Sequence, residues 1–145
     1  MIRLHIRNFI CLFGFLLLIS GCISEDNRKL EEIKRITSPD KKVDAVISVL
    51  NGGATSSNGY HIFIVPNGTV PYDIKFSQFS CDHQDSLGIK WVDNKLLNIF
   101  YKEARIFRFS NFWNSDNVDN WTYVVEIKLN SESNASNLSK RDKFE

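Results

Sequence analysis

WTYVVEIKL, residues 121–129, is the stretch of this 145-residue chain that decides the fold class. One face of the segment carries Trp121, Tyr123, Val125, Ile127 and Leu129, and the other carries Thr122, Glu126 and Lys128. Successive side chains of a β-strand point to opposite sides of the sheet, so this alternation predicts a strand with one buried and one solvated face.

The same period of two recurs through residues 37–129. It predicts strands over residues 43–50, 60–65, 74–79, 89–92, 96–101, 104–109 and 121–129, and no window after residue 36 has a helical period. The short link between residues 101 and 104 predicts a hairpin, and Arg105 and Arg108 should face opposite sides of their strand. About seven short strands predict an all-β fold, a small antiparallel β-sandwich or barrel-like sheet.

The N-terminal segment has the three parts of an export signal. Arg3 and Arg7 form a basic start, residues 9–19 form an apolar run interrupted only by Gly14, and small residues follow. Crossing a bilayer takes about 20 apolar residues, so this run is too short for a transmembrane helix.

Residues 19–22 read Ile-Ser-Gly-Cys and resemble the lipobox of bacterial lipoproteins. The resemblance implies cleavage after residue 21, acyl chains on Cys22 and attachment to a leaflet of the bacterial cell envelope, where two or more chains hold a protein stably. Ile23 stands where an Asp would resemble a retention signal for the inner membrane, which favours the outer membrane facing the periplasm in an organism that has one. An ordinary signal peptide cut near Gly21 and a short uncleaved anchor are the alternatives.

Four regions follow from these patterns. We expect a signal peptide at residues 1–21, an acylated cysteine and a charged tether with at most a short helix at residues 22–36, a β-domain at residues 37–129 and a disordered polar tail at residues 130–145. Residues 38–42, Ser-Pro-Asp-Lys-Lys, predict a turn, because Pro fixes φ and Asp can bind its own downstream backbone.

Charge and cysteine content limit the possible functions further. The chain has 18 Lys plus Arg against 17 Asp plus Glu, and cleavage after residue 21 removes two of the arginines. No basic excess remains to neutralise phosphates, so nucleic-acid binding has no electrostatic support. Cys11 leaves with the signal and Cys22 is acylated, so Cys81 alone remains; no internal disulfide can form, and we expect this thiol to be buried.

Two loops are candidate recognition surfaces. Residues 51–59 are rich in Gly, Ser and Asn, and their glycines let the backbone approach a partner closely, although no Lys follows as in a phosphate-binding loop. Residues 111–120 combine Asn and Asp with aromatic rings, which sugars and protein partners both use. The candidate recognition residues are Phe112, Trp113, Asn114, Asn51, Gly52, Gly53 and Thr55. Closure of the end of the core by the two aromatic rings is the competing interpretation.

Cys81-Asp82-His83 is the candidate for covalent chemistry. Residues i and i+2 of an extended chain share a face, so a Cys–His pair could form there. No orienting group, oxyanion hole or zinc spacing accompanies the pair, and the spacing of Asn114, Asp116 and Asp119 fails the calcium loop of an EF-hand. We therefore expect no catalytic residue, no metal and no cofactor.

The middle of the chain resembles a set of small uncharacterised bacterial lipoproteins. The similarity spans residues 36–129 and rests on Ser38-Pro39-Asp40, Asn51-Gly52-Gly53-Ala54-Thr55 with Gly59-Tyr60, Trp91-Val92-Asp93, Ala104-Arg105-Ile106-Phe107 and Asn111-Phe112-Trp113. The resemblance implies an envelope β-domain and brings no activity, so no catalytic residue carries over.

Together these patterns predict a lipid-anchored envelope protein that is not an enzyme and that binds an envelope protein or glycan. An envelope hydrolase or thiol enzyme using Cys81 and His83 is one alternative, and a structural component of an envelope assembly is another. The membrane, reached through the acyl chains on Cys22, is the partner that the lipobox resemblance implies.

Overall fold

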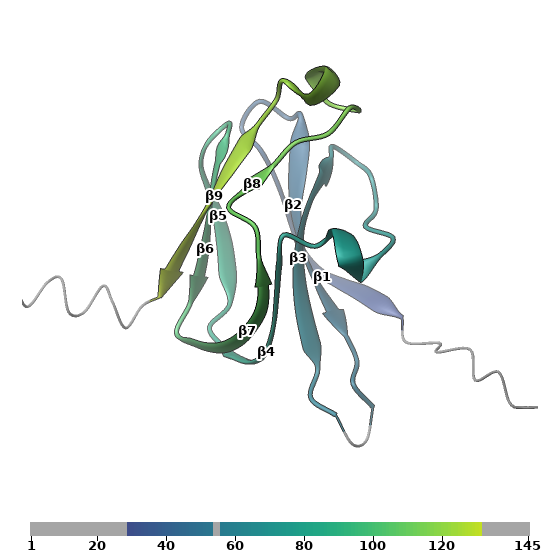
Figure 1. Cartoon of the computed structure of the whole chain (residues 1–145), viewed down its shortest axis with the longest axis vertical. Helices are drawn as coiled ribbons and strands as arrows, with labels where there is room; N and C mark the ends of the chain where they lie inside the picture. The colour runs from purple at the N-terminus through teal and green to yellow at the C-terminus, as the bar shows by residue number, and fades with distance from the viewer. Residues whose placement is uncertain (1–28, 54–55, 132–145) are drawn as a thin grey trace, which may run out of the picture.

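The computed structural model describes residues 29–53 and 56–131, which fold into two β-sheets packed face to face (Figure 1). The first sheet consists, in order, of β1 (Leu30–Thr37), β2 (Val43–Leu50), β3 (Gly59–Pro66), β4 (Phe79–Asp85) and β7 (Glu103–Phe109). The second consists of β5 (Gly88–Asp93), β6 (Leu96–Tyr101), β9 (Val125–Ser131) and β8 (Phe112–Trp113). Two 3₁₀ helices, η2 (Ile74–Phe76) and η3 (Asp119–Trp121), precede β4 and β9. The predicted all-β sandwich is confirmed.

Several predicted regions fall outside the described residues. They are the signal peptide at residues 1–21, Cys22 with the start of the tether, Thr55 in the glycine-rich loop, and the tail from residue 132 onward. The first two residues of the predicted tail, 130 and 131, belong to β9. Within the described part of the chain, no helix is long and apolar enough to cross a membrane.

Part of the predicted tether is a strand instead of a short helix. β1 begins at Leu30 and pairs antiparallel with β2. Its register shifts between Glu32 and Lys34, which leaves Ile33 as an extra, exposed residue. Leu30 lies opposite Leu50 and Ile36 lies opposite Ala45, so the bulge places these two side chains on opposite faces of the sheet, and the helical stripe predicted from Leu30, Ile33 and Ile36 does not form.

Two further strand predictions are wrong in extent. Residues 74–76 form η2, and β4 starts only at Phe79. β9 starts at Val125, and Trp121 lies at the end of η3 instead of in the strand. In total the described residues contain nine strands, where the sequence predicts about seven.

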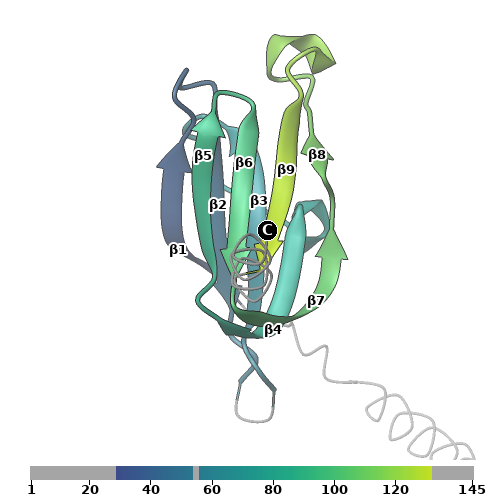
Figure 2. The same cartoon turned by 90° about the vertical axis from the view of Figure 1, so that its left-hand side faces the viewer.

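The predicted hairpin between residues 101 and 104 is also wrong. β6 lies in the second sheet and β7 in the first, so the chain crosses between the sheets at Lys102 (Figure 2). The backbone N–H of Lys102 donates to the carbonyl of Asp85 at the end of β4, which fixes the crossing point. β9 then lies between β6 and β8 and pairs parallel with β6, whereas all other strand pairs of the described residues are antiparallel.

A bulge in β7 changes the direction of one arginine. The register of β4 with β7 skips Phe107, which is therefore an extra residue. Beyond it Arg108 lies opposite Ser80, and before it Arg105 lies opposite Asp82. Ser80 and Asp82 are two apart on one strand, so both arginines share the outer face of the first sheet, and the predicted opposite orientation is wrong.

The core lies between the two sheets. Its buried side chains include Val43, Ala45, Ile47, Ile62, Ile64, Phe79 and Cys81 from the first sheet and Ile89, Leu97, Ile99, Val125 and Ile127 from the second. The part of the outer face of the first sheet formed by β2 and β3 is buried too, because the connection of residues 67–78, which includes η2, lies across it (Figure 1). Phe63 on this face is only 2% exposed. Burying a side chain of this kind contributes about 1.5–3 kcal/mol.

Tyr123 joins the end of the second sheet to turns on both sheets. Its ring is buried, and its hydroxyl lies 2.8 Å from Oδ2 of Asp40 and 2.6 Å from the carbonyl oxygen of Asn94. Asp40 also accepts hydrogen bonds from the Ser38 hydroxyl and from the backbone N–H of Lys42, so the predicted turn after β1 is confirmed. Burial raises the pKa of the Tyr123 hydroxyl, and its hydrogen bond to Asp40 raises that pKa further.

Candidate functional site

An open groove with a volume of about 570 Å³ runs along the half of β3 that β4 leaves unpaired. β4 pairs with β3 only from Tyr60 to Ile62, so residues 63–66 form the floor of the groove. One wall consists of residues 69–76, in the β3–β4 connection, and the other of residues 113–121, which include η3. The topology thus creates the groove where the first sheet narrows, at the η3 end of the sandwich (Figure 1).

The wall formed by residues 69–76 presents two aromatic rings to solvent. Tyr72 is 81% exposed and Phe76 is 49% exposed, and their ring centroids lie 5.2 Å apart at an angle of 49°. Asp73 starts η2, because its side chain accepts a hydrogen bond of 2.9 Å from the backbone N–H of Lys75. This cap fixes the short helix that carries Phe76 to the groove.

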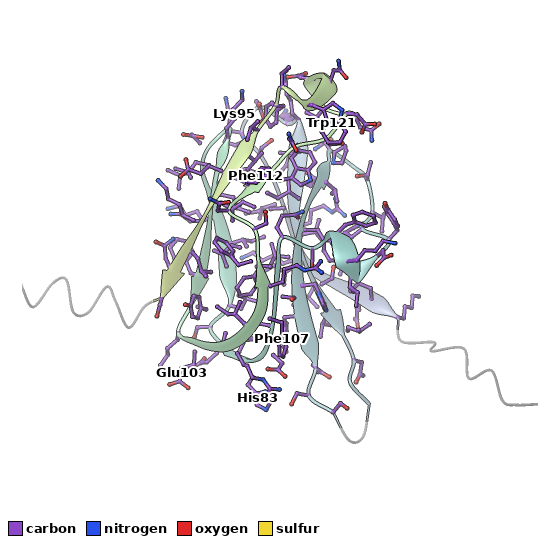
Figure 3. All side chains as sticks on the ribbon, in the orientation of Figure 1. His83, Lys95, Glu103, Phe107, Phe112 and Trp121 are labelled. Atoms are coloured by element: carbon purple, nitrogen blue, oxygen red, sulfur yellow. The ribbon has the colours of Figure 1, made fainter. Side chains whose placement is uncertain are left out.

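The wall formed by residues 113–121 contributes two tryptophans. Trp113 is half-buried and packs against the core, whereas Trp121 is 54% exposed (Figure 3). Asp119, Asn120 and Trp121 have φ angles of 49°, 47° and 70°, in the left-handed region. That conformation is rare for a bulky side chain and costs on the order of 1–3 kcal/mol per residue. The backbone N–H of Trp121 donates to the carbonyl of Ser115 at 3.0 Å, which holds the turn.

Amide side chains lie between these rings. Asn114 and Asn117 line the groove on the side of Trp121, and Gln78 lines it on the side of β3. Gln78 is occupied, because its Oε1 accepts from the backbone N–H of Ile64 at 2.7 Å. The side-chain amide of Asn117 makes no hydrogen bond within the described part of the chain, so it is available to a ligand.

The charge of the groove is negative. Its charged lining residues are Asp73 and Asp116, and no described Lys, Arg or His lines it. The backbone N–H of Lys75 and then its ammonium, which lies beside the groove and 2.9 Å from Asp73, hold the pKa of that carboxyl below its usual value. Asp116 forms no ion pair with any described residue, so its charge is the one left uncompensated.

The structure divides the recognition residues predicted from the sequence among three places. Trp113 and Asn114 line the groove. Phe112 is 56% exposed in β8, but it does not line the groove (Figure 3). Asn51, Gly52 and Gly53 lie beyond the opposite end of the sandwich, in a hollow shared with residues 29–32. The two predicted loops therefore do not form one surface.

Sequence reasoning missed part of the groove. It did not single out Tyr72 or Phe76, and it assigned Trp121 to the buried face of a strand. The sequence does carry signals for the two turns that place Tyr72 and Trp121 at the groove. Pro71 precedes Tyr72, and Asp119-Asn120, residue types that tolerate the left-handed region, precede Trp121.

The thiol of Cys81 and the imidazole of His83 do not share a face, so the Cys–His pair on which the alternative of a thiol enzyme depends does not form. Cys81 lies in the core and is 1% exposed; burial, and then the neighbouring Asp82, raise the pKa of its thiol to about 12. His83 has a φ of 47° and is exposed near the lower end of the sandwich (Figure 3). The irregular register between Asp82 and Asp85 breaks the alternation that the prediction assumed. A buried thiol with a raised pKa is a poor nucleophile.

His83 instead bridges a serine and an aspartate. Its Nε2 lies 3.2 Å from the hydroxyl of Ser57, and its Nδ1 lies 3.0 Å from Oδ1 of Asp82. This order is that of a Ser-His-Asp relay, in which the imidazole activates the hydroxyl. Two features differ from a working relay. Both carboxylate oxygens of Asp82 also bind Arg105, and Ser57 and His83 are exposed to solvent.

Oxyanion donors near Ser57 are occupied. The backbone N–H groups of Gly52 and Gly53 in the same loop already donate to the side chains of Asn58 and Asn51. A hydrolytic site requires donors that converge on the developing oxyanion. The row therefore connects the β2–β3 loop to β4, and the N–H groups of Gly52 and Gly53 in that loop are engaged by side chains.

No group of three or more His, Cys, Asp or Glu side chains that could hold a metal ion is found among the described residues. No protein-family model, curated protein or solved structure matches the chain. The candidate site is therefore interpreted from its own geometry, and the groove is the feature with the most side chains available to a ligand.

Proposed function

We propose that this protein is a lipid-anchored binding module of the bacterial cell envelope and that its ligand occupies the groove between residues 69–76 and 113–121. The observation that carries the proposal is the exposure of Tyr72, Phe76 and Trp121 around a single hollow. A monomeric domain buries most large aromatic side chains, and clusters left in solvent mark binding sites.

The direction of the chain supports an anchored role. Leu30 lies opposite Leu50 at the start of β1, and Leu50 directly precedes the loop at the lower end of the sandwich. The groove lies toward the other end, beside η3 (Figure 1). With acyl chains on Cys22, eight residues before Leu30, the chain would enter the domain at the end away from the groove. The groove would then point from the membrane into the envelope space.

Labelling in cells tests the anchor. Labelled palmitate should enter the protein and be lost in a Cys22→Ser variant, which should also leave the membrane fraction. Retention of label by the variant would contradict anchoring at Cys22.

Crosslinking in cells tests the groove. A photoreactive amino acid at Asn117, on the groove wall, should capture a defined species that the same group at Lys90 does not capture. Lys90 is exposed on β5 in the second sheet and does not line the groove, so it is a matched control. The same species at both positions, or none at either, would contradict a ligand in the groove.

A second candidate function is an envelope hydrolase. The row of Ser57, His83 and Asp82 favours it, with Ser57 as the nucleophile instead of Cys81. In such an enzyme the Ser57 hydroxyl would attack a carbonyl carbon while His83 accepts its proton. A fluorophosphonate probe that labels the native protein at Ser57, and fails to label a His83→Ala variant, would support this role. Absence of labelling in the native protein would eliminate it.

A further inference from the structure

We infer that the groove takes a neutral glycan, a chain of sugar rings bearing hydroxyl or acetamido groups and no net charge. This inference rests on the proposed binding role of the groove and specifies the class of ligand. It follows from four properties of the groove: exposed aromatic faces on both walls, free amides, a negative charge and a β3 edge that is closed to strand addition.

The aromatic side chains suit a ligand made of rings. Tyr72 and Phe76 come from one wall, and Trp113 and Trp121 from the other. Sugar rings have apolar C–H faces that pack on aromatic faces and polar hydroxyls at their edges. A volume of about 570 Å³ lies within the range of roughly 300–1,000 Å³ typical of ligand sites.

The polar groups suit the edges of such rings. Asn117 carries a free side-chain amide, with one acceptor and two N–H donors, and the amide N–H of Asn114 makes only a long contact of 3.5 Å with the carbonyl of Trp121. Asp116 offers an acceptor, since its Oδ1 receives only a hydrogen bond of 3.2 Å from Ser115. Amides and carboxylates placed beside aromatic rings can bind several hydroxyl groups at once.

The charge of the groove disfavours acidic ligands. Asp116 has no cationic partner, and no described Lys, Arg or His lines the groove to receive a carboxylate or phosphate. An acidic glycan would bring a like charge next to Asp116, which is unfavourable. A neutral glycan avoids this repulsion.

The backbone of the floor argues against an extended peptide. A peptide that adds to a sheet needs free N–H and C=O groups along the edge strand. On β3 the N–H of Ile64 already donates to Gln78 Oε1, the carbonyl of Ile62 accepts from the N–H of Gln78, and Pro66 has no N–H. The open half of β3 is therefore a poor edge for strand addition.

Titration calorimetry with the detergent-solubilised protein tests the ligand class. The probes are a neutral tetrasaccharide of N-acetylglucosamine, cellotetraose, an anionic tetragalacturonate and a proline-rich decapeptide. We expect saturable binding of at least one neutral saccharide and none of the anionic one. Trp121→Ala and Asn117→Ala should each weaken that binding about tenfold, whereas Phe112→Ala, an exposed aromatic outside the groove, should change it less than about twofold.

Circular dichroism of each variant shows whether it folds. If the Trp121→Ala variant does not fold, the Asn117→Ala variant still tests the groove. The inference is overturned if the peptide or tetragalacturonate binds and no neutral saccharide does. It is also overturned if Phe112→Ala weakens saccharide binding as much as the groove variants do. Specific capture of a protein by the crosslinker at Asn117 overturns the glycan class but leaves the binding role intact. No binding by calorimetry and no capture in cells overturns both.

Discussion

Asp44 is a buried charge that fixes one wall of the groove to the first sheet, and replacing it tests how strongly that wall is held. Its carboxylate accepts hydrogen bonds from Arg35 Nη1 (2.7 Å), Asn67 Nδ2 (3.0 Å) and the backbone N–H of Gly68 (2.9 Å). The residue is 2% exposed. These donors come from β1 and from the start of the connection that forms one groove wall. One side chain of β2 therefore fastens both an edge strand and that wall.

Replacement of Asp44 by Ala would leave three buried or partly buried donors without their acceptor. A hydrogen bond to a charged group is worth about 1.5–3 kcal/mol, and removing one partner of a buried ion pair costs about 3–5 kcal/mol. Arg35 keeps a second carboxylate, Glu32, at 2.6 Å, so the cost falls at the lower end of that range. We expect Asp44→Ala to lower the free energy of unfolding by about 3 kcal/mol and Asp44→Asn by about half as much.

The effect of Asp44 should also depend on pH. Burial alone would raise its pKa, but the Gly68 N–H, the Thr37 hydroxyl and Arg35 together lower it. A carboxyl group with a lowered pKa stabilises the fold above its unfolded pKa of about 3.9, and the stabilisation is lost as the pH falls below that value. The difference between the native protein and Asp44→Asn should therefore be full at about pH 7 and smaller at about pH 3, and it should keep falling as the pH approaches the lowered pKa of the folded state.

Urea unfolding followed by tryptophan fluorescence measures these differences. Glu126→Gln is the control, because Glu126 is exposed on β9 and its ion pair with Lys128, at 3.6 Å, should contribute less than about 0.5 kcal/mol. A loss below about 0.5 kcal/mol for Asp44→Ala would refute the reasoning. An Asp44→Asn difference that is equal at both pH values would refute its electrostatic part.

Three other predictions concern the core. Phe63→Ala should lower the free energy of unfolding in the same urea assay by about 3–5 kcal/mol, because its ring is buried under the groove wall. Phe112→Ala, at an exposed ring, should change it by no more than about 0.5 kcal/mol, and similar values for the two variants would place Phe63 in solvent. Tyr123→Phe should lower the free energy of unfolding by about 1–3 kcal/mol, since the hydroxyl binds Asp40 and Asn94 in a buried setting, and an unchanged melting curve would contradict those bonds. A maleimide probe at about pH 8 should label Cys81 only in denaturant, because burial raises the pKa of its thiol to about 12, and mass-spectrometric detection of the label on native protein would contradict that burial.

The alternation of side chains predicted the strands but not their partners. The start of β9 follows a clean period of two, whereas β2 and β3 are β-forming runs with apolar residues on both faces, and the sequence placed all three strands within a few residues. The period says nothing about which sheet a strand joins, so the crossing at Lys102 resembled a hairpin turn. Bulges at Ile33 and Phe107 shifted the period by one residue, and the sequence carries no strong signal for an inserted residue.

The groove was partly visible in the sequence. Trp113 and Asn114 were predicted because aromatic and amide residues lie next to each other in the chain. Tyr72 and Phe76 come from a distant segment, which the tertiary fold brings to the groove opposite residues 113–121. Ile74 and Phe76 are spaced like alternate residues of a strand, whereas the Asp73 cap selects a 3₁₀ turn. Long-range proximity of this kind cannot be derived from local periodicity.

The position of β9 determines when the second sheet can form. This last strand of the described chain lies between β6 and β8, and β8 has no other partner in its sheet. During synthesis, β6 would expose an unpaired edge until residues 125–131 emerge. Unpaired strand edges recruit other chains and lead to aggregation. A truncation before Val125 should therefore yield an aggregation-prone protein, not a smaller stable domain, because the second sheet is completed only once residues 125–131 are available.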